Sequence, residues 1–520
     1  MTETKEFVNP VIAIEHLYKN MKKSWKIGFF TTFFLGFLVH GYVLSNNFLT
    51  WDSMWNLYSP QDMLSSGRPF LTYVCAISSY FNLPWLNGIL ALFFLSVSVA
   101  LLVEAFRLEN PVTIMLGAAF VVTFPSTAEG FCYNFTIDGY MIAFMLSILA
   151  FLLADRWKKG FLLGGLLLGF SIGIYQGYLA VTIVLCILAL MMYLLDNKEV
   201  KFVLKKMSVY LGMGMIGYGF YLLSLYIMLR IKNVTLSGYQ GTDKVFAFSE
   251  LPKGIVEAYR NFFTFAVYGN VFGYNIWNVI AVVILVLGII ILVGLILLKL
   301  TDKKLIKIFL FLLLAGMLPI GANVILLTSS ATLFRLIMRI PWVLFFIFAM
   351  AITEKYCINN IQLSSGIRKL QQWSMMVSML IMVVNFSVLS NIDYFNMNER
   401  YEKTYSFAVR LIDRIEQTEG YETGVKVSIL GGIPNVIYYP SMSVTNEVLD
   451  GHYASAGDYT VNSTEKFATF YKHYMNVSIN TIDYSEELKL IETEEYINMP
   501  TFPAKDSIAF IGDVLVIKLN

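Results

Sequence analysis

The chain has 520 residues, of which 57% are hydrophobic and only 14% are charged. With a mean hydropathy of +0.64, this composition leaves too little polar surface for a soluble globule of that length and predicts a polytopic α-helical membrane protein. The net charge of +2 gives no reason to expect a nucleic-acid partner.

Membrane-spanning helices are the first elements that the sequence predicts. A helix needs roughly 17 to 25 mostly apolar residues to cross about 30 Å of hydrocarbon, and about eleven segments meet this requirement. The third to the sixth of them are short or interrupted by glycine. The segments are Trp25–Ser45, Pro84–Phe106, Pro111–Ser126, Asp138–Ala154, Gly160–Gln176, Tyr178–Leu195, Met207–Leu229, Tyr274–Leu298, Leu305–Leu327, Phe334–Thr353 and Trp373–Ser390.

Basic residues in the connecting loops predict the orientation, because Lys and Arg in short loops stay on the cytoplasmic side. They gather in every second loop, whereas the first loop on the other side has only Arg68. The basic residues of the rich loops are Lys22, Lys23, Lys26, Arg107, Arg156, Lys158, Lys159, Lys198, Lys201, Lys205, Lys206, Lys299, Lys303, Lys304, Lys307, Lys355, Arg368 and Lys369. Residues 1–24 are therefore expected in the cytoplasm, residues 25–390 in the membrane and residues 391–520 outside.

The composition beyond residue 390 becomes charged and mixed, with no further apolar span. This change predicts a small extracytoplasmic α+β domain. Its expected elements are a helix over Glu399–Glu419 that ends at Gly420, strands over Val425–Leu430 and Asn476–Ile482, and a hairpin over Ser507–Lys518 with a Gly512-Asp513 turn.

Asp52 is the leading catalytic candidate. It follows the first span in Asn47-Phe-Leu-Thr-Trp51-Asp52-Ser-Met-Trp55, within a loop that continues to about residue 83 and is far longer than a helix–helix connector needs. The loop reads as helices that lie along the outer interface, with Trp51 and Trp55 toward lipid. A carboxylate there can meet the head of a lipid substrate; the alternative is a solvated acid beside an aromatic anchor.

Four further polar residues at outer span ends are candidates for substrate binding. Arg68 lies in Gly67-Arg68-Pro69 of the same loop. Asp138 opens the fourth span, where an acid also interacts favourably with the helix dipole. Tyr175 and Gln176 end the fifth span, and the Gln176 amide can bind a sugar hydroxyl or satisfy turn carbonyls. For Asp138 and Gln176 both interpretations stay open.

Arg335 and Arg339 begin the tenth span in Phe334-Arg335-Leu-Ile-Met-Arg339-Ile-Pro341. Spaced four apart, they are expected on one face of a helix near the outer surface. Arginine within a span is costly and usually meets an anionic group, and the planar guanidinium suits a phosphate. The alternative is snorkelling of the side chains to lipid headgroups.

Taken in order, Asp52, Gly67-Arg68-Pro69, Ile174-Tyr175-Gln176 and Met338-Arg339-Ile340-Pro341 make this chain resemble the GtrII-type bacterial glucosyltransferases, which belong to the GT-C class of integral membrane glycosyltransferases. The likeness covers most of residues 25–390. Asp52 is a single acid where many relatives have a pair, so a second carboxylate and a divalent metal stay open.

The resemblance implies transfer of a sugar, glucose or another hexose, from a polyprenyl-phosphate-linked donor to a cell-envelope polysaccharide. The reaction would take place on the outer face of a bacterial cytoplasmic membrane, with inversion. Asp52 would take the proton of the acceptor hydroxyl, and Arg68, Arg335 and Arg339 would stabilise the leaving phosphate. Tyr175, Gln176 and Asp138 would orient the sugar. The expected partners are the lipid-linked donor, the glycan acceptor and membrane lipid; no resident cofactor is identified.

Two other functions stay open. A transporter or lipid-linked sugar flippase would show internal symmetry and broken segments at matching places of two halves, and neither is evident. A polysaccharide polymerase would carry a large catalytic outer loop, whereas the 230–270 loop is moderate in length. The absence of a Walker-type loop, of Cys/His metal spacing and of Gly-x-Ser-x-Gly argues against ATP hydrolysis and structural zinc.

Overall fold

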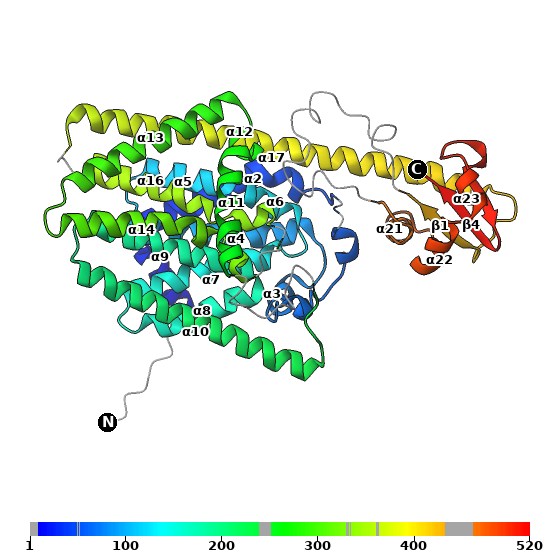
Figure 1. Cartoon of the computed structure of the whole chain (residues 1–520), viewed down its shortest axis with the longest axis horizontal. Coiled ribbons are helices and arrows are strands. Elements are labelled where there is room, and N and C mark those ends of the chain that lie inside the picture. The colour runs from blue at the N-terminus through cyan, green and yellow to red at the C-terminus, as the bar shows by residue number, and fades with distance from the viewer. Residues whose placement is uncertain are drawn as a thin grey trace.

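The computed structural model describes residues 9–48, 50, 52–238, 251–328, 332, 334–359, 363–431 and 461–520. Figure 1 shows a bundle of long helices and a smaller unit of helices and strands, which one long helix, α17 (Ser365–Glu416), connects. We call the smaller unit, formed by the chain beyond residue 400, the C-terminal domain. The other helices of the bundle are α1 (Pro10–Asn20), α2 (Lys23–Leu44), α4 (Pro84–Phe106), α5 (Pro111–Thr123), α6 (Pro125–Cys132), α7 (Ile137–Arg156), α8 (Gly160–Ile174), η4 (Gln176–Tyr178), α9 (Leu179–Leu195), α10 (Val200–Lys232), α11 (Leu251–Phe263), η7 (Thr264–Tyr268), α12 (Asn270–Gly273), α13 (Ile276–Leu298), α14 (Lys304–Ala322), α15 (Ile325–Thr328), η8 (Leu336–Arg339), α16 (Trp342–Thr353) and η9 (Glu354–Ile358).

The predicted spans all fold as helices, and the mostly helical fold of a polytopic membrane protein is confirmed. In the described part of the chain, nine helices are long and apolar enough to cross a membrane. The third predicted span is instead a pair of helices, α5 and α6, that meet at 45°. The fifth, α8, is an apolar helix of 15 residues that packs between α7 and α10.

The bend between α5 and α6 has a local cause. Pro125 is the first residue of α6, and proline lacks the N–H that would continue the hydrogen-bond ladder of α5. All eight residues of α6 are buried, among them Glu129. The break therefore places a short helix with an acidic side chain inside the bundle.

The loop after α2 folds as a series of short helices, as its sequence predicts. These are η1 (Ser53–Asn56), η2 (Leu64–Ser66), α3 (Leu71–Cys75) and η3 (Ala76–Ser78). Left-handed backbone at Gly67 and Ser79 ends η2 and η3, since a residue with positive φ cannot continue a helix. Trp55 is exposed, and Trp51 lies outside the described residues.

The C-terminal domain is α+β, as predicted. Its sheet has the order β2-β1-β4-β3, with β1 parallel to β2 and β4, and β3 antiparallel to β4. The predicted hairpin forms with Gly512 at φ +63° in its turn. Of the predicted 476–482 strand, only Asn480 and Thr481 pair with β1, and Asn476 has a left-handed backbone. The elements are β1 (Lys426–Leu430), α21 (Thr464–Phe470), η10 (Tyr471–Met475), β2 (Asn480–Thr481), α22 (Tyr484–Leu490), α23 (Glu494–Asn498), η11 (Lys505–Ser507), β3 (Ile508–Ile511) and β4 (Val514–Lys518).

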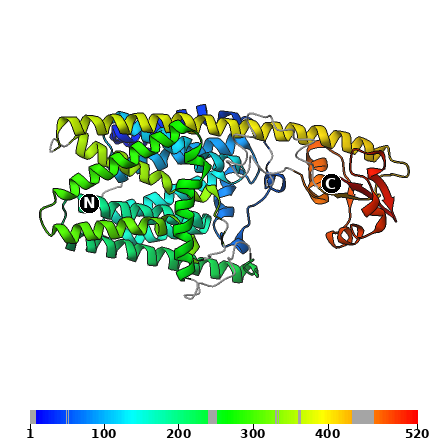
Figure 2. The same ribbon diagram turned by 45° about the horizontal axis from the view of Figure 1, so that its top comes forward.

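α17 joins the last predicted span to the predicted 399–419 helix without a break. Its 52 residues contain no proline, and the only glycine, Gly366, lies in its first turn, so nothing local stops the helix. At a rise of about 1.5 Å per residue it is roughly 78 Å long. Figure 2 shows it running along the bundle and on into the C-terminal domain, which makes the link between the two parts a continuous helix.

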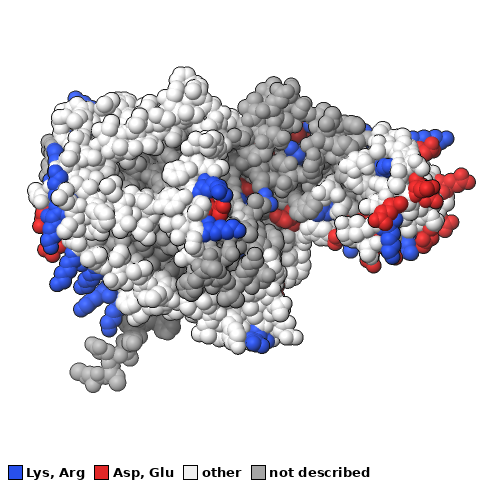
Figure 3. Space-filling view, viewed as in Figure 1, with Lys and Arg blue, Asp and Glu red and all other residues white. Residues whose placement is uncertain are grey.

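Charged side chains divide the surface. Lys and Arg gather at the end of the bundle that faces away from the C-terminal domain, and the C-terminal domain carries both signs of charge (Figure 3). Between them most of the bundle surface on this face is uncharged, as a surface in contact with lipid acyl chains must be, apart from one group of basic and acidic side chains near its middle and a basic patch at its lower edge. We call the first of these regions the basic end of the bundle.

Candidate active site

Asp52 lies in a turn whose backbone is held by its own neighbours. The N–H of Thr50 donates to Ser53 Oγ (2.8 Å), and the N–H of Ser53 donates to Thr50 Oγ1 (3.1 Å). Asn56 Nδ2 donates to the Asp52 carbonyl oxygen (2.8 Å). Thr50, Ser53 and Asn56 thus fix the main chain on both sides of Asp52 and leave its side chain available.

The Asp52 side chain is exposed, and among the described residues its carboxylate accepts no hydrogen bond. Protein atoms nevertheless crowd it on several sides, and the resulting loss of hydration raises the pKa of Asp52 above its usual value. The positive charges of Lys466, Arg335 and Arg68 act in the opposite direction, in that order. One acid therefore lies among three cations that come from distant parts of the chain.

The loop that carries Arg68 docks on Gln176, so the structure brings together two motifs that are far apart in the sequence. Gln176 Nε2 donates to the carbonyl oxygens of Ser66 (3.0 Å) and Gly67 (2.8 Å), and the Tyr221 hydroxyl donates to Gly67 as well (3.0 Å). Gly67 has φ +74°, and an added Cβ would lie 2.8 Å from Gln176 Nε2. Gln176 thus satisfies turn carbonyls, one of its two predicted roles.

Arg68 is held by two aromatic side chains. Its Nη1 donates to the Tyr140 hydroxyl (3.1 Å), and its guanidinium carbon lies 5.0 Å from the centre of the Tyr175 ring. The two rings contact each other, with centroids 4.6 Å apart. Tyr140 was not among the predicted site residues, and no spacing in the sequence connects it to Arg68. Tyr175 acts in this structure as a support for Arg68.

Asp138 is completely buried in the first turn of α7. Its closest polar neighbours are the Ser78 hydroxyl and the N–H of Gly139, although neither reaches the geometry of a good hydrogen bond to the carboxylate. With none of its surface accessible, Asp138 cannot contact a sugar in this conformation. Its position agrees with the helix-terminal interpretation.

Arg335 and Arg339 do not share a helical face, and this prediction is wrong. Arg335 has an extended backbone (φ −71°, ψ 158°) and precedes η8, which is a 3₁₀ turn. A 3₁₀ helix has three residues per turn, so side chains four positions apart point in different directions. Arg335 is exposed, with its charge acting on Asp52, whereas only 6% of the Arg339 surface is accessible.

The buried guanidinium of Arg339 is bound by neutral groups. Nη1 donates to Asn323 Oδ1 (3.2 Å) and to the Asn261 carbonyl oxygen (3.3 Å), and Nη2 donates to Asn261 Oδ1 (3.2 Å). The rings of Phe334 and Phe265 flank it at 4.2 and 4.9 Å. Arg339 therefore ties η8 to α11 and to the end of α14, and three of its five N–H donors are used in these contacts.

Lys466 of α21 is the site residue that sequence reasoning missed. It is 3% exposed and is the cation that acts most strongly on Asp52. A single lysine in a domain of mixed charge carries no signal in its spacing, and more than 400 positions separate it from Asp52. Only the tertiary structure brings the two together.

Sequence reasoning also missed a buried pair of acids. Glu129 of α6 and Asp393 of α17 are fully buried and interact electrostatically. Beside them, His40 Nδ1 lies 2.7 Å from the Tyr394 hydroxyl. An acid within an apolar segment is itself a sign of a special environment, but Glu129 and Asp393 each lie three residues beyond the end of a predicted span, so this sign was lacking. Among the described residues, no group of three or more His, Cys, Asp or Glu side chains could hold a metal ion.

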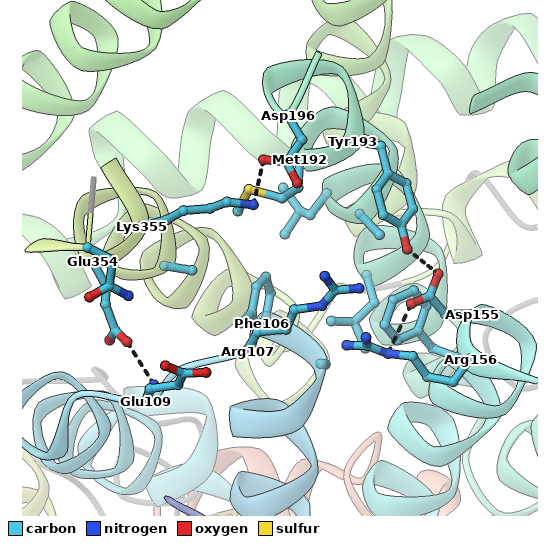
Figure 4. Close-up of a pocket in the computed structure, with 17 residues that line it drawn as sticks. Phe106, Arg107, Glu109, Asp155, Arg156, Met192, Tyr193, Asp196, Glu354 and Lys355 are labelled. Carbon is cyan, nitrogen blue, oxygen red and sulfur yellow. Dashed lines mark hydrogen bonds and ion pairs between the residues drawn. The ribbon is translucent and has the colours of Figure 1, made fainter. Parts of the chain in front are cut away.

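A separate pocket of about 340 Å³ lies at the basic end of the bundle, beside the C-terminal ends of α4 and α7 (Figure 4). Asp138 lies at the opposite end of α7. Several of the pocket's charged groups are bound to each other or to the backbone. Lys355 pairs with Asp196 (2.5 Å), and Glu354 Oε1 accepts from the N–H of Glu109 (2.7 Å). The further ionic residues that line the pocket are Arg107, Asp155 and Arg156. None of the predicted site residues reaches this pocket.

Comparison with protein families gives one result. The family model described as "Glucosyl transferase GtrII" matches residues 41–352, more than half of the chain. No curated protein and no solved structure matches the chain. The matched region begins within α2 and ends in α16; it includes every predicted site residue and leaves out the C-terminal domain with Lys466.

Proposed function

The chain belongs to the GtrII glucosyl transferase family, and on this premise we propose which reaction it catalyses and where. The glucosyltransferase moves glucose or another hexose from a polyprenyl-phosphate-linked donor to a polysaccharide of the cell envelope. Asp52 is the general base. The reaction takes place on the outer face of the cytoplasmic membrane of a bacterium.

The observation that carries the proposal is the setting of Asp52. One accessible carboxylate lies among the charges of Lys466, Arg335 and Arg68, so the site has an excess of positive charge. Such a site suits a substrate that brings its own negative charge, as a phosphate-linked sugar does. The base is accessible: its side chain is exposed, and its carboxylate forms no ion pair with these three cations.

The reaction has one displacement step. The oxygen of the acceptor hydroxyl forms a bond to the anomeric carbon while the bond from that carbon to the phosphate oxygen breaks. Asp52 takes the hydroxyl proton as the bond forms, and the lipid phosphate leaves with the electron pair. Attack on the face opposite the leaving group, with no covalent intermediate, gives inversion at the anomeric carbon.

Arg335 and Arg68 supply positive charge for the leaving phosphate, because a charge that develops in the transition state is stabilised by donors already in place. Tyr140, Tyr175 and Gln176 hold Arg68 and its loop. We assign Gln176 and Tyr175 to this positioning role instead of direct contact with the sugar. Arg339 takes a comparable role for η8, since its donors bind Asn261 and Asn323.

The side of the membrane follows from charge. The basic end of the bundle faces away from the C-terminal domain (Figure 3), and positively charged loops stay in the cytoplasm. Asp52, which neighbours α21 of the C-terminal domain, then faces outward. This orientation supports an envelope glycan as the acceptor, and the family favours transfer over the alternative functions of a carrier or a polymerase.

The test compares Asp52→Asn with Asp62→Asn. Asp62 is an acid of the same loop that pairs with Lys232 (2.6 Å). Membrane vesicles that contain the endogenous glycan receive radiolabelled polyprenyl-phosphate glucose, and label in the glycan is measured. We expect Asp52→Asn to lose transfer while Asp62→Asn keeps it, with both proteins present in the membrane at wild-type amounts. Transfer at the wild-type rate by Asp52→Asn would overturn the role of Asp52.

A further inference from the structure

The C-terminal domain is attached to the membrane bundle through a shared helix. Phe386 and Leu389 of α17 are buried in the core of the bundle, whereas Phe407 and Leu411 of the same helix are buried in the core of the C-terminal domain. With no break in α17 between these pairs, rotation of one part turns the other. The C-terminal domain therefore has a defined position over the bundle.

The domain also contacts the turn that carries the proposed base. Met54, two residues after Asp52, is 1% exposed and belongs to the hydrophobic core of the C-terminal domain, together with Phe467 and Phe470 of α21. α21 packs directly on η1. Burial of a methionine side chain contributes about 1.5 to 3 kcal/mol, so this contact favours one docked arrangement. Figure 3 shows charged side chains where the two parts meet.

Lys466 lies on the helix that makes this contact. Its Nζ has almost no accessible surface, and the N–H of Lys466 is capped by Ser463 Oγ (3.4 Å), which sets the start of α21. A buried ammonium is costly unless nearby groups compensate its charge. Lys466 acts on Asp52 from α21, Arg335 acts from the segment before η8, and Arg68 acts from the loop before α3.

We propose that the C-terminal domain completes the active site: α21 holds the η1 turn in place and sets Lys466 beside Asp52 as a positioning residue that keeps this carboxylate ionised. This inference rests on the proposed role of Asp52 as the general base. It goes beyond the family match, which ends at residue 352 and leaves out α21.

The physical reason is the balance of two effects on Asp52. Crowding by protein raises the pKa of this carboxyl, which favours the protonated form, and a protonated acid cannot accept the hydroxyl proton. Lys466 lowers the pKa again. Without Lys466 the base is protonated in a larger fraction of molecules at a given pH, so activity is lost first at low pH.

The experiment measures transfer from polyprenyl-phosphate glucose to endogenous glycan in membrane vesicles as a function of pH. It compares wild type, Lys466→Met, Lys466→Arg and a matched control, Lys472→Met, which removes an exposed lysine from the adjacent η10 turn. For Lys466→Met we expect the acidic limb of the profile to move to higher pH, with a loss of transfer of roughly three- to tenfold relative to wild type on that limb and near-complete recovery at the alkaline end. Lys466→Arg and Lys472→Met keep the wild-type profile.

A merely structural role for Lys466 would lower the rate equally at every pH, and this result would overturn the inference. An unchanged profile for Lys466→Met would do the same. Because the variant could misfold, the resistance of the C-terminal domain to trypsin is measured in parallel, and the comparison with Lys466→Arg separates charge from packing. If Asp52→Asn is inactive and Lys466→Met resembles wild type, the inference alone fails. If Asp52→Asn is active, the proposed function fails.

Discussion

The two ends of the helix bundle carry charge in different ways. At the basic end, Asp155 accepts hydrogen bonds from the hydroxyls of Tyr193 (2.6 Å) and Tyr210 (2.7 Å). It also pairs with Arg156 (3.3 Å) and Lys206 (3.3 Å). Every oxygen of this buried acid is in use. Charges arranged in this way stabilise a helix terminus or a helix contact and have no capacity left for a substrate.

At the other end, Asp52 accepts no hydrogen bond to its carboxylate in the described part of the chain, although Lys466, Arg335 and Arg68 act on it from three separate segments. Its backbone is fixed while its side chain is accessible. The comparison teaches that a fixed main chain and an unused functional group together distinguish a reactive acid from a structural one. The number of charges nearby does not, because both ends have many.

The most direct test of this comparison is to neutralise one acid at each end of the bundle. We expect Asp52→Asn to reduce transfer by about 10² to 10⁴-fold, the usual contribution of a general base, with an unchanged unfolding temperature. Asp155→Asn removes the partner of two cations and lowers the unfolding temperature, yet keeps the turnover rate per folded molecule. The measurements are vesicle transfer assays and thermal unfolding in detergent. A catalytic defect specific to Asp155→Asn would contradict the comparison.

The two arginines of the tenth span give the next largest effect. Arg335→Ala removes an exposed cation near Asp52, and we expect the KM for the lipid-linked donor to rise by roughly tenfold or more, since hydrogen bonds between charged groups contribute about 1.5 to 3 kcal/mol. Arg339→Ala removes the contacts to Asn261 and Asn323 and should lower the unfolding temperature instead. Kinetics at varied donor concentration distinguish the two. An increase in KM specific to the donor in Arg339→Ala would show instead that Arg339 binds the phosphate.

A change in the length of α17 tests whether the position of the C-terminal domain matters for activity. Two alanines inserted after Asn398 rotate the C-terminal domain by about 200° around the helix axis, because each residue turns the helix by about 100°. α21 then leaves η1, which loses both Lys466 and the contact that holds the turn, so we expect a loss of transfer at acidic pH at least as large as that of Lys466→Met, roughly three- to tenfold or more. Asn398→Ala, which keeps the helix in register, is the control. Full activity after the insertion would show that the domain works without this docking.

The smallest predicted effect concerns the support of the Arg68 loop. Gln176→Ala removes two hydrogen bonds to the carbonyls of Ser66 and Gly67. Because each such bond contributes about 1 kcal/mol, we expect transfer to fall by roughly three- to tenfold. Gln372→Ala, which removes a comparable bond to the Cys357 carbonyl (2.7 Å) in another part of the bundle, should leave transfer unchanged. Equal rates for both variants would mean that the loop does not need Gln176.

Much of the fold could be predicted from the sequence because the signals are local. Apolar length predicts a helix that can cross a bilayer, since the backbone must satisfy its own hydrogen bonds there. Gly512 and the alternation around it predicted the C-terminal hairpin. The family resemblance also followed from short motifs around Asp52, Arg68, Gln176 and Arg339, and the family match includes all four.

The predictions that failed concern local geometry, which depends on tertiary contacts. A spacing of four residues places Arg335 and Arg339 together only if the turn is α-helical, whereas η8, which packs on α6, is a 3₁₀ turn, and the two side chains separate. The same spacing analysis could not tell that the Gln176 amide is used by the loop at Ser66 and Gly67. Hydrogen bonds between distant segments leave no period in a sequence.

By itself, then, the sequence determined which segments are helical, which end of the bundle is basic and which acid is the candidate base, because these depend on composition and on neighbours along the chain. Only the tertiary structure decided which cations surround Asp52. Lys466 lies near Asp52 because the 52 residues of α17 join the C-terminal domain to the bundle and because Met54 of the first loop is buried in the core of that domain. Such a meeting depends on the packing of two cores, and packing is a property of the folded chain as a whole.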